Sequence, residues 1–504
     1  MKLRKSLSLC ITLVMLLTLL VTASGALAQQ ANKPTIVLSY PVMVIIPPVE
    51  GVLKVEEELN RYLEEKGVNI NVKLNPTDVA NYATTIDMML LANEQVDLFC
   101  PLQLQQSINS NQLLSLNPYI DNELKGAVDI FGRNYLAPFS VNDETYAIPC
   151  YKGNVILYNW VVRKDAFEAA GLTVGDIKNV DDITPALAKL HELYPDVAAI
   201  APRLGMGTGN TYMLENALYG SEYYQYTSLG SGVGIIGDDL TVVNLFDSEI
   251  FKKTAETAYE WSQLGYTPDD ASILTEDSYD LSAAGKALSF IIGYAEPTDT
   301  VAEMQSDRDD YEYVAIKLST DIMSSGGIPW GIARNCKNPS EAAQILDMLY
   351  TDDYFLNTLL FGIEGWTYVV NEPRPTGEKS ISYPEGMDMF TAPYNCLLSS
   401  GVMGNEFNIW LMDDEVDERK QFKLDNMQNA IYSPVWGFTF DTLNVRSQAS
   451  AVQNVITQYY AGLACGELDP AEYLPILNED LEAAGMSEII EEAQRQLDAW
   501  LAQP

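Results

Sequence analysis

Histidine and cysteine are scarce in this chain. The only histidine, His191, lies in LAKLHELYPD on a predicted helix. A single imidazole excludes a metal site made of several histidines, and its surroundings indicate no Ser-His or Cys-His pair. Beyond Cys10, the cysteines show no C-x-x-C spacing, so neither a zinc site nor a disulfide scaffold is indicated. One or two bridges, for example Cys100 with Cys150, remain open outside the cell; the remaining cysteines are Cys336, Cys396 and Cys465.

Basic residues are also few, with 30 Lys and Arg against 70 Asp and Glu, a formal net charge of −40. A surface this acidic repels phosphate backbones, so the composition argues against nucleic acid as a partner. The charge keeps a protein in solution and says nothing about its fold.

Long apolar runs are absent except at the N-terminus. Lys2, Arg4 and Lys5 precede an apolar run over 7–21, and Ala-Leu-Ala ends at position 28. This pattern predicts a signal peptide over 1–28, too short and wrongly flanked for a stable membrane span. A retained N-terminal anchor is the alternative. Cleavage would leave 27 basic and 70 acidic residues, a formal charge of −43.

The region 35–100 alternates strand and helix patterns. TIVLSY (35–40) predicts a buried strand, VLKVEEELNRYLEEKG an amphipathic helix, and VNINVKL (68–74) a second strand. A helix over 78–93 and a third strand at 96–100 follow. This order is typical of a parallel sheet covered by helices, whose ligands bind beyond the carboxyl ends of the strands. A 504-residue chain that is 47% hydrophobic has room for two or more domains.

A second unit is predicted over about 152–317. Its helices are expected at 164–170, 181–193 and 249–264, and its strands at 287–292 and 311–318. The glycine-rich LGSGVGIIGDDLTVVN indicates turns, because no Lys-Ser/Thr follows it as in a phosphate loop. Further on, Asn338 and Pro339 indicate the start of a helix.

The rest of the chain is predicted to be loop-rich from about 366 to 430. Two amphipathic helices are expected after it. One buries Val452, Val455, Ile456, Tyr459 and Leu463; the other begins at Ser487 and buries Ile490, Ala493, Leu497 and Trp500 or Leu501.

Taken together, several segments resemble the carbohydrate-type extracellular solute-binding proteins of bacterial ABC importers, in particular the LipO-like group. They include KVEEELNRYLEEK, LLANEQVDLF, TYAIPCY, WVVRKDAFEAAGL, AGKALSFIIGY, KNPSEAAQILDMLYTD, GIEGWTYVV and SPVWGFTFD, in the family's order across nearly the whole mature chain. The resemblance implies an α/β, two-lobed, hinge-linked fold of the periplasmic-binding-protein type II, with a mainly helical C-terminal extension.

The resemblance also implies a domain division. Residues 29–148 and 319–366 would form lobe 1, 149–318 lobe 2, and 367–504 a LipO-like C-terminal domain packed on the lobes. The chain would cross between lobes within 146–159 and again within 317–325. Pro149, which cannot donate to a strand ladder, marks the point where the first crossing leaves its sheet.

Sugar recognition needs flat apolar faces together with amide and carboxylate groups. Family correspondence nominates nine ligand-binding residues at strand ends and loops: Tyr40, Gln103, Tyr151, Asn154, Tyr294, Glu296, Trp330, Glu364 and Trp366. Core packing is the competing interpretation for each aromatic residue, and a solvated or capping role for each polar one. Trp410 and Trp436 are expected to pack the C-terminal segment against the lobes.

The expected function is capture of a solute, an oligosaccharide, by a monomeric protein that closes around it and delivers it to a membrane ABC permease. No cofactor, metal or catalytic residue is expected. The alternatives are a ligand-presenting sensory or adhesive protein on the same fold and a secreted glycosidase that uses two carboxylates. The protein would be exported to the cell envelope or secreted. Because Gln29 stands where lipoproteins carry cysteine, a lipid anchor is not supported.

Overall fold

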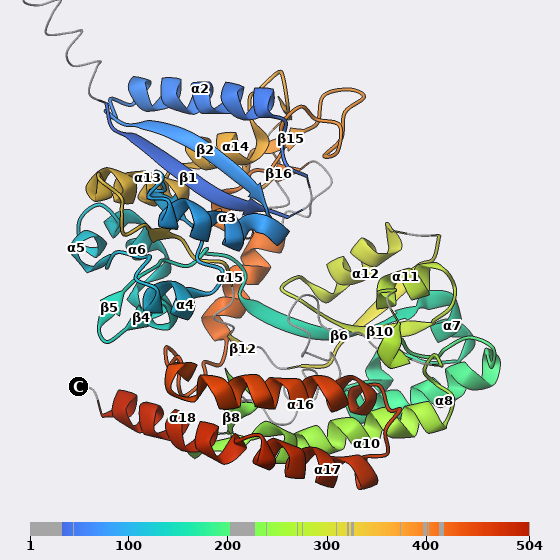
Figure 1. Ribbon diagram of the computed structural model, residues 1–504. Coiled ribbons are helices and arrows are strands. Elements are labelled where there is room, and N and C mark those ends of the chain that lie inside the picture. The colour runs from blue at the N-terminus through green and yellow to red at the C-terminus, as the bar shows by residue number, and fades with distance from the viewer. Residues whose placement is uncertain are drawn as a thin grey trace, which may run out of the picture. The chain divides into compact units, whose positions relative to one another are not determined.

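The computed structural model describes residues 33–502 except 44, 202–226, 238, 270, 275, 309, 320–321, 324–326, 373, 397–400, 402 and 413–417. The predicted signal peptide lies outside these residues. The chain forms two compact units (Figure 1). Unit 1 holds the described residues of 33–151 and 327–412, and unit 2 holds those of 152–323 and 418–502.

Unit 1 is built on a four-stranded sheet in the order β13-β3-β1-β2. β1 pairs in parallel orientation with both β2 and β3, so the predicted parallel βαβαβ arrangement is confirmed. β13 pairs with β3 in antiparallel orientation. β1 continues through Pro41 to Val42, beyond its predicted end. It does so because β3 pairs only with Leu38 and Ser39, and the missing proline N–H therefore interrupts no second ladder. The strands are β1 (Thr35–Val42), β2 (Asn71–Asp78), β3 (Leu98–Phe99) and β13 (Gly331–Ile332).

Amphipathic helices pack against this sheet. The helix α2 (Val49–Glu65) has the predicted face, with Val52, Val55, Leu59 and Leu63 buried. The helix predicted after Asn338 begins at Pro339, although the Asn338 side chain makes no capping hydrogen bond. The helices of unit 1 are α2 (Val49–Glu65), α3 (Val79–Leu91), α4 (Leu104–Asn109), α5 (Asn117–Ile120), α6 (Lys125–Phe131), α13 (Pro339–Thr351) and α14 (Asp353–Phe361), and short strands add β4 (Ser140–Val141), β5 (Glu144–Thr145), β14 (Val369–Val370), β15 (Ser380–Ser382) and β16 (Leu411–Met412).

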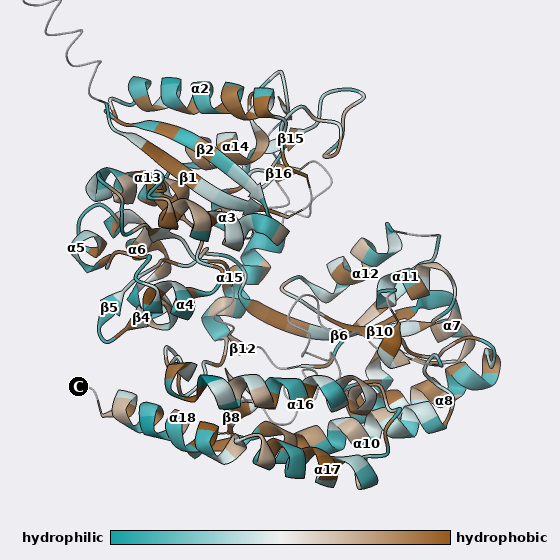
Figure 2. Ribbon diagram, in the orientation of Figure 1, coloured by the Kyte–Doolittle hydropathy of each residue, from teal (hydrophilic) through white to brown (hydrophobic). Residues whose placement is uncertain are grey.

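Unit 2 is organised around the long strand β6, which is hydrophobic along most of its length (Figure 2). β10, β11 and β12 all pair with it in antiparallel orientation. The glycine-rich stretch forms an antiparallel three-stranded sheet, β7-β8-β9, with Gly230 and Gly232 at positive φ, so the predicted turn is confirmed. The strands are β6 (Val155–Arg163), β7 (Thr227–Gly230), β8 (Val233–Ile236), β9 (Asp239–Asn244), β10 (Ser289–Tyr294), β11 (Tyr313–Lys317) and β12 (Ile322–Met323).

The helices predicted in unit 2 are all present, but four further helices, over 278–283, 298–306, 419–429 and 470–483, were not predicted. The one over 419–429 lies in the region that was expected to be loop-rich. The one over 470–483, which contains Pro475, was not predicted because proline disrupts the helical pattern. The helices are α7 (Lys164–Ala169), α8 (Ile183–Leu193), α10 (Glu249–Gln263), α11 (Ser278–Ala283), α12 (Thr298–Ser306), α15 (Arg419–Asn429), α16 (Arg446–Ala464), α17 (Pro470–Ala483) and α18 (Met486–Leu501).

One hydrophobic core joins the two segments of unit 2. Trp160 and Trp261 from the first segment and Ile456 and Leu497 from the second belong to the same buried cluster. Helices α16 and α17 lie beside α10, and α18 packs against α16, α17 and β9 (Figure 1). The region expected as one C-terminal domain, 367–504, is therefore divided: its described residues before 413 belong with unit 1, and those from 418 onward share the core of unit 2.

The two chain connections predicted within 146–159 and 317–325 run close together inside each unit. In unit 1, Ile148 and Trp330 exchange backbone hydrogen bonds of 2.9 Å in both directions. In unit 2, β12 pairs with the beginning of β6. The unit boundary falls after Tyr151 in the first connection. Each unit therefore anchors its own ends of the two strands.

The described part of the chain contains neither a disulfide bridge nor a helix suited to cross a membrane. The five cysteines in the described part of the chain are free, and Cys100 and Cys150 are both buried. Gly331 of β13 pairs with Phe99, which precedes Cys100, and the adjacent Trp330 forms an isolated bridge with Ile148, two residues before Cys150. None of the described helices has both the length and the apolar character that crossing a membrane requires.

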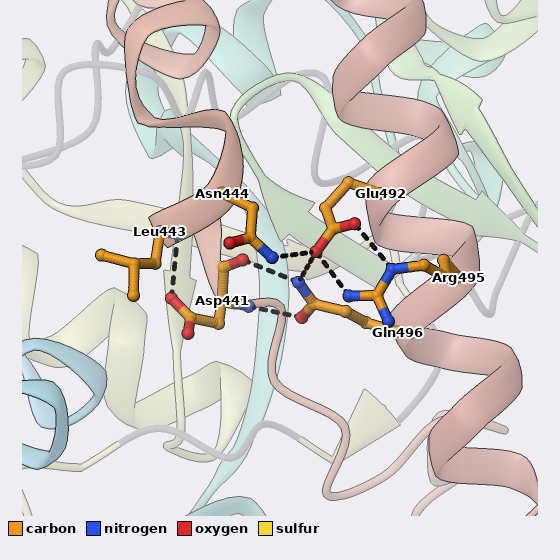
Figure 3. A network of polar contacts seen from close by, with 6 residues as sticks. All are labelled: Asp441, Leu443, Asn444, Glu492, Arg495 and Gln496. Carbon is orange, nitrogen blue, oxygen red and sulfur yellow. Dashed lines mark hydrogen bonds and ion pairs between the residues drawn. The ribbon is translucent and has the colours of Figure 1, made fainter.

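A polar network connects the C-terminal helix α18 to the segment that precedes α16 (Figure 3). Gln496 bonds the backbone of Asp441 in both directions, at 2.9 and 2.8 Å. Glu492 accepts hydrogen bonds from Arg495, Asn444 and Gln496. The Arg495 guanidinium is the main reason why the pKa of Glu492 falls to about 2, since partial burial acts in the opposite direction.

The shared core predicts that α18 is needed by all of unit 2. Leu497 is fully buried, so Leu497→Ala should lower the free energy of unfolding by about 2–5 kcal/mol. The control is Leu501→Ala on the same helix, where the side chain is 41% exposed and little should change. Urea unfolding followed by circular dichroism measures both. A separate early transition confined to the C-terminal helices would contradict a shared core.

Glu492 should make stability depend on acid pH. A carboxyl whose folded pKa is about 2, below its ordinary 4.5, stabilises the fold above pH 4.5, and this contribution is lost as the pH falls from 4.5 to 2. Glu492→Gln should therefore lower the urea midpoint at pH 7, with the difference from wild type shrinking as the pH falls through this range. Glu491→Gln, an exposed position of the same helix, is the matched control. A difference that stays constant with pH would refute the assignment.

Candidate functional site

The carboxyl edge of the unit 1 sheet provides the first part of the candidate site. β1 lies between β2 and β3, so the connections leaving β1 and β3 diverge at their carboxyl ends. Open parallel sheets bind ligands at such a point. Gln103 lies four residues beyond β3, exposed, at the residue preceding α4. The structure thus places Gln103 where the topology favours a ligand.

Two predicted aromatic residues lie in the interior of unit 1. Tyr40 and Trp330 are 0% exposed, and their ring centroids are 6.4 Å apart. Burial raises the pKa of the Tyr40 hydroxyl well above its ordinary value. These side chains have no surface that a solute can touch in this structure, and their contacts are those of core packing.

Tyr151 is half-buried within a group of aromatic rings in unit 1. Its ring centroid lies 5.1 Å from that of Phe407, 5.6 Å from Tyr135 and 6.2 Å from Phe131. Its backbone is also held, donating to the Gly404 carbonyl at 2.7 Å and accepting from the Glu406 N–H at 2.8 Å. This last residue of unit 1 before the chain crosses is therefore firmly positioned.

Glu364 and Trp366 lie on the loop that follows α14. Gly365 between them has φ +77°, and its N–H bonds the Tyr368 carbonyl at 2.8 Å, which shapes a tight loop. The ammonium of Lys54 lies 4.6 Å from the centroid of the half-buried Trp366 ring. Glu364 is exposed. The loop keeps a carboxylate and an indole close together.

Asn154 stands at the beginning of β6 in unit 2. It is 3% exposed, and its side-chain oxygen has no hydrogen-bond partner among the described residues. Burying a polar group without a partner costs about 1–3 kcal/mol, so such a group is uncommon in a structural role. Of the nine predicted residues, Tyr40 and Asn154 have a buried side-chain oxygen without such a partner, and Tyr40 lies among the packed aromatic residues of unit 1, so Asn154 is the stronger candidate for a ligand contact.

Tyr294, at the end of β10, is held by a second tyrosine. Its hydroxyl shares a hydrogen bond of 2.7 Å with that of Tyr279. The Arg308 guanidinium lies 4.2 Å from the Tyr279 ring centroid, and these three side chains line a small cavity with Gln305. The arrangement fixes the half-buried Tyr294 ring.

Glu296 is buried and fully engaged in ion pairs. Arg419 binds both carboxylate oxygens at 2.6 Å, and the Lys423 ammonium lies 2.8 Å from one of them. Glu296 and Lys423 are each 5% exposed. Sequence reasoning missed both cations because their region was expected to be loop-rich and part of a separate C-terminal domain, and no local pattern joins residues 123 positions apart.

The described residues provide no metal-binding cluster, and the only histidine of the chain lies beside a tyrosine ring. No group of three or more His, Cys, Asp or Glu in the described part of the chain is arranged to hold a metal ion. His191 lies half-buried on α8 with its ring 5.4 Å from that of Tyr266. These positions contain binding-type side chains: amides, hydroxyls, aromatic rings and paired charges.

Comparison with known protein families identifies the chain. The family of bacterial extracellular solute-binding proteins matches residues 52–354, more than half of the sequence. The chain belongs to this family. A domain of unknown function, DUF3502, matches residues 434–502, which correspond to the C-terminal part of unit 2. The suspected family and its C-terminal domain are thereby confirmed.

Relatives extend the comparison to nearly the whole chain. A carbohydrate ABC transporter substrate-binding protein of Streptococcus pneumoniae serotype 4 is 22% identical over 448 residues, 88% of this chain and 87% of the relative. The crystal structure of an N-glycan transport solute-binding protein from Streptococcus pneumoniae has a TM-score of 0.77 at 21% identity, covering 93% of this chain and 99% of that one.

A third relative widens the range of organisms. An extracellular solute-binding protein from Bifidobacterium longum subsp. infantis has a TM-score of 0.67 at 14% identity, covering 93% of this chain and 98% of that one. These likenesses confirm the predicted solute-binding-protein fold. The family and its relatives consist of binding proteins, in agreement with the expectation that this one is not an enzyme.

The ion pairs of Glu296 should be essential to the fold of unit 2. Glu296→Gln would leave Lys423 and Arg419 without this carboxylate in a buried setting, which should cost about 3–5 kcal/mol of unfolding free energy. The control, Glu312→Gln, breaks an exposed pair with Lys164 and should change little. Chemical denaturation compares the two variants. Equal stabilities would show that the buried charges do not hold this region.

Proposed function

We propose that this solute-binding protein captures an oligosaccharide outside the cytoplasm and delivers it to an ABC permease, without chemical change to the solute. The observation that carries the proposal is membership of the extracellular solute-binding family over 52–354. A matched relative is a carbohydrate ABC transporter substrate-binding protein, and solved relatives were crystallised with Man1GlcNAc and Man5GlcNAc.

The side chains at the candidate positions support a sugar as the solute. Pyranose rings present C–H faces that stack on aromatic rings, and hydroxyl groups that hydrogen-bond amides and carboxylates. Six of the nine predicted residues combine these chemistries. Asn154 has a buried side-chain oxygen without a hydrogen-bond partner among the described residues, and the other five are at least partly exposed: Gln103, Tyr151, Tyr294, Glu364 and Trp366. We propose all of these as solute contacts, and we assign Tyr40, Trp330 and Glu296 supporting roles.

The mechanism follows from the division of the contacts. Gln103, Tyr151, Glu364 and Trp366 belong to unit 1, and Asn154 and Tyr294 to unit 2. A solute that contacts both units binds best when the units close, so binding shifts an open–closed equilibrium. The closed protein, acting as a monomer, would dock on the permease. The N-terminal segment 1–28 would direct export, and the protein would remain at the envelope or be released.

Binding is testable by thermal shift and calorimetry. A solute at about 100 times its Kd should raise the free energy of unfolding by roughly 2.7 kcal/mol. Mannose- and N-acetylglucosamine-containing oligosaccharides form one panel, and peptides and other polar solutes the second. Chromogenic glycosides, incubated with the protein, should not be hydrolysed. Stabilisation by peptides but not by any sugar would overturn the sugar assignment, and hydrolysis would overturn the binding role.

Asn154 should contribute to binding and not to stability. Asn154→Leu keeps the branched outline of the side chain and removes a buried oxygen that has no hydrogen-bond partner among the described residues, so the ligand-free protein should be about as stable as wild type. Sugar affinity should fall about 10- to 100-fold, because one or two hydrogen bonds to the solute are lost. Calorimetry measures affinity and thermal melting measures stability. Unchanged affinity would remove Asn154 from the site, and Glu491→Gln should leave both quantities unchanged.

A further inference from the structure

The segment Gly153–Asn154, called the corner here, is contacted on one side by the Lys423 side chain. A Cβ atom added to Gly153 would lie 2.8 Å from Cδ and 2.9 Å from Cγ of Lys423, closer than side chains tolerate. The alkyl stem of Lys423 therefore rests directly on the Gly153 backbone. Glycine is required here by this close approach, since Gly153 does not have a positive φ.

The other end of Lys423 is fixed by charge. Its ammonium pairs with Glu296 at 2.8 Å, and Arg419, one helical turn earlier on α15, binds the same carboxylate at two points. Arg419 and Lys423 would repel each other on one helix face if Glu296 did not lie between them. The three residues form a clamp, defined here as Glu296, Arg419 and Lys423, with little freedom to move.

The clamp is attached to the strand that carries the candidate site. Glu296 follows β10 by two residues, and Tyr294, the last residue of β10, pairs with Leu157 of β6. The direction of the antiparallel pair takes Glu296 alongside the beginning of β6, where Gly153 and Asn154 lie. Within the clamp, Lys423 therefore contacts Gly153, and Glu296 lies beside the beginning of β6.

We propose that Lys423 is a positioning residue of the solute site, which holds the Gly153–Asn154 corner so that the Asn154 amide keeps the orientation in which it meets a solute hydroxyl. This inference rests on the proposed function, because it takes Asn154 to be a contact. It gives the chain segment after residue 418 a role in recognition. α15, which precedes the domain of unknown function, would position a solute-binding residue without contacting the solute itself.

The test uses a steric double-mutant cycle in the full-length protein. Gly153→Ala should push against Lys423, displace the corner and weaken sugar binding about tenfold, the value of one hydrogen bond. In the background of Lys423→Ala, which vacates the space that the added methyl needs, the same change should cost much less affinity. Gly175→Ala, where an added Cβ meets no atom closer than 3.9 Å, is the matched control and should be neutral. An equal loss in both backgrounds would refute the proposal.

A ligand-free measurement separates this inference from the proposed function. The side-chain amide resonances of Asn154, assigned through Asn154→Leu, should shift in Gly153→Ala and return toward their wild-type positions in Gly153→Ala/Lys423→Ala. If the Asn154 resonances do not change in Gly153→Ala, the positioning role of Lys423 is refuted, whether or not sugars bind. Shifts as expected, in a protein that no sugar stabilises, would support the clamp and overturn the sugar assignment alone.

If Gly153→Ala does not fold, Lys423→Met decides the question. It keeps the apolar stem on Gly153 and removes the charge, while Arg419 still pairs with Glu296. The Asn154 resonances should broaden or shift and sugar affinity should fall, while the melting temperature falls less than in Glu296→Gln because one cation still pairs with the carboxylate. A fall in melting temperature with no change in the Asn154 resonances would mean that Lys423 is structural only.

Discussion

The hydrophobic core of unit 2 draws on two segments that are separated in the sequence by a complete return to unit 1. Phe251 and Trp261 come from the first segment, and Ile456 and Leu497 from the second. Burial of apolar surface is the dominant favourable contribution to folding, and it is not directional. The C-terminal helices therefore complete the core of unit 2, and the domain of unknown function contributes buried side chains to it.

The same return of the chain brings charged groups into the unit. α15 supplies two cations to Glu296, and a carboxylate this deeply buried needs such partners, because desolvation of a lone charge costs several kcal/mol. The consequence reaches the binding residues, since the stem of Lys423 lies on Gly153 beside the buried and unpartnered Asn154. A side chain that stabilises unit 2 through an ion pair thus also contacts the backbone next to a proposed solute-binding residue.

Hydrophobic periodicity predicted most elements because it is a local property. The buried faces of α2 and α16 repeat every three or four residues, and the alternation of strand and helix over 35–100 indicated a parallel sheet correctly. The strand predictions were less accurate at their ends: β1 runs through Pro41, which the pattern alone treats as a stop. α17 was missed because Pro475 conceals its pattern.

By itself, the sequence determined the order of strands and helices over 35–100, the exclusion of histidine-based metal chemistry and, through its motifs, the family. Only the tertiary structure decided which candidate side chains are available to a solute. Trp330 and Tyr40 look like stacking platforms in the sequence but are sealed in a core, and Glu296 looks like a free acceptor but is held by two cations. The physical reason is distance along the chain: burial and charge pairing depend on contacts between segments more than a hundred residues apart, which no local pattern records.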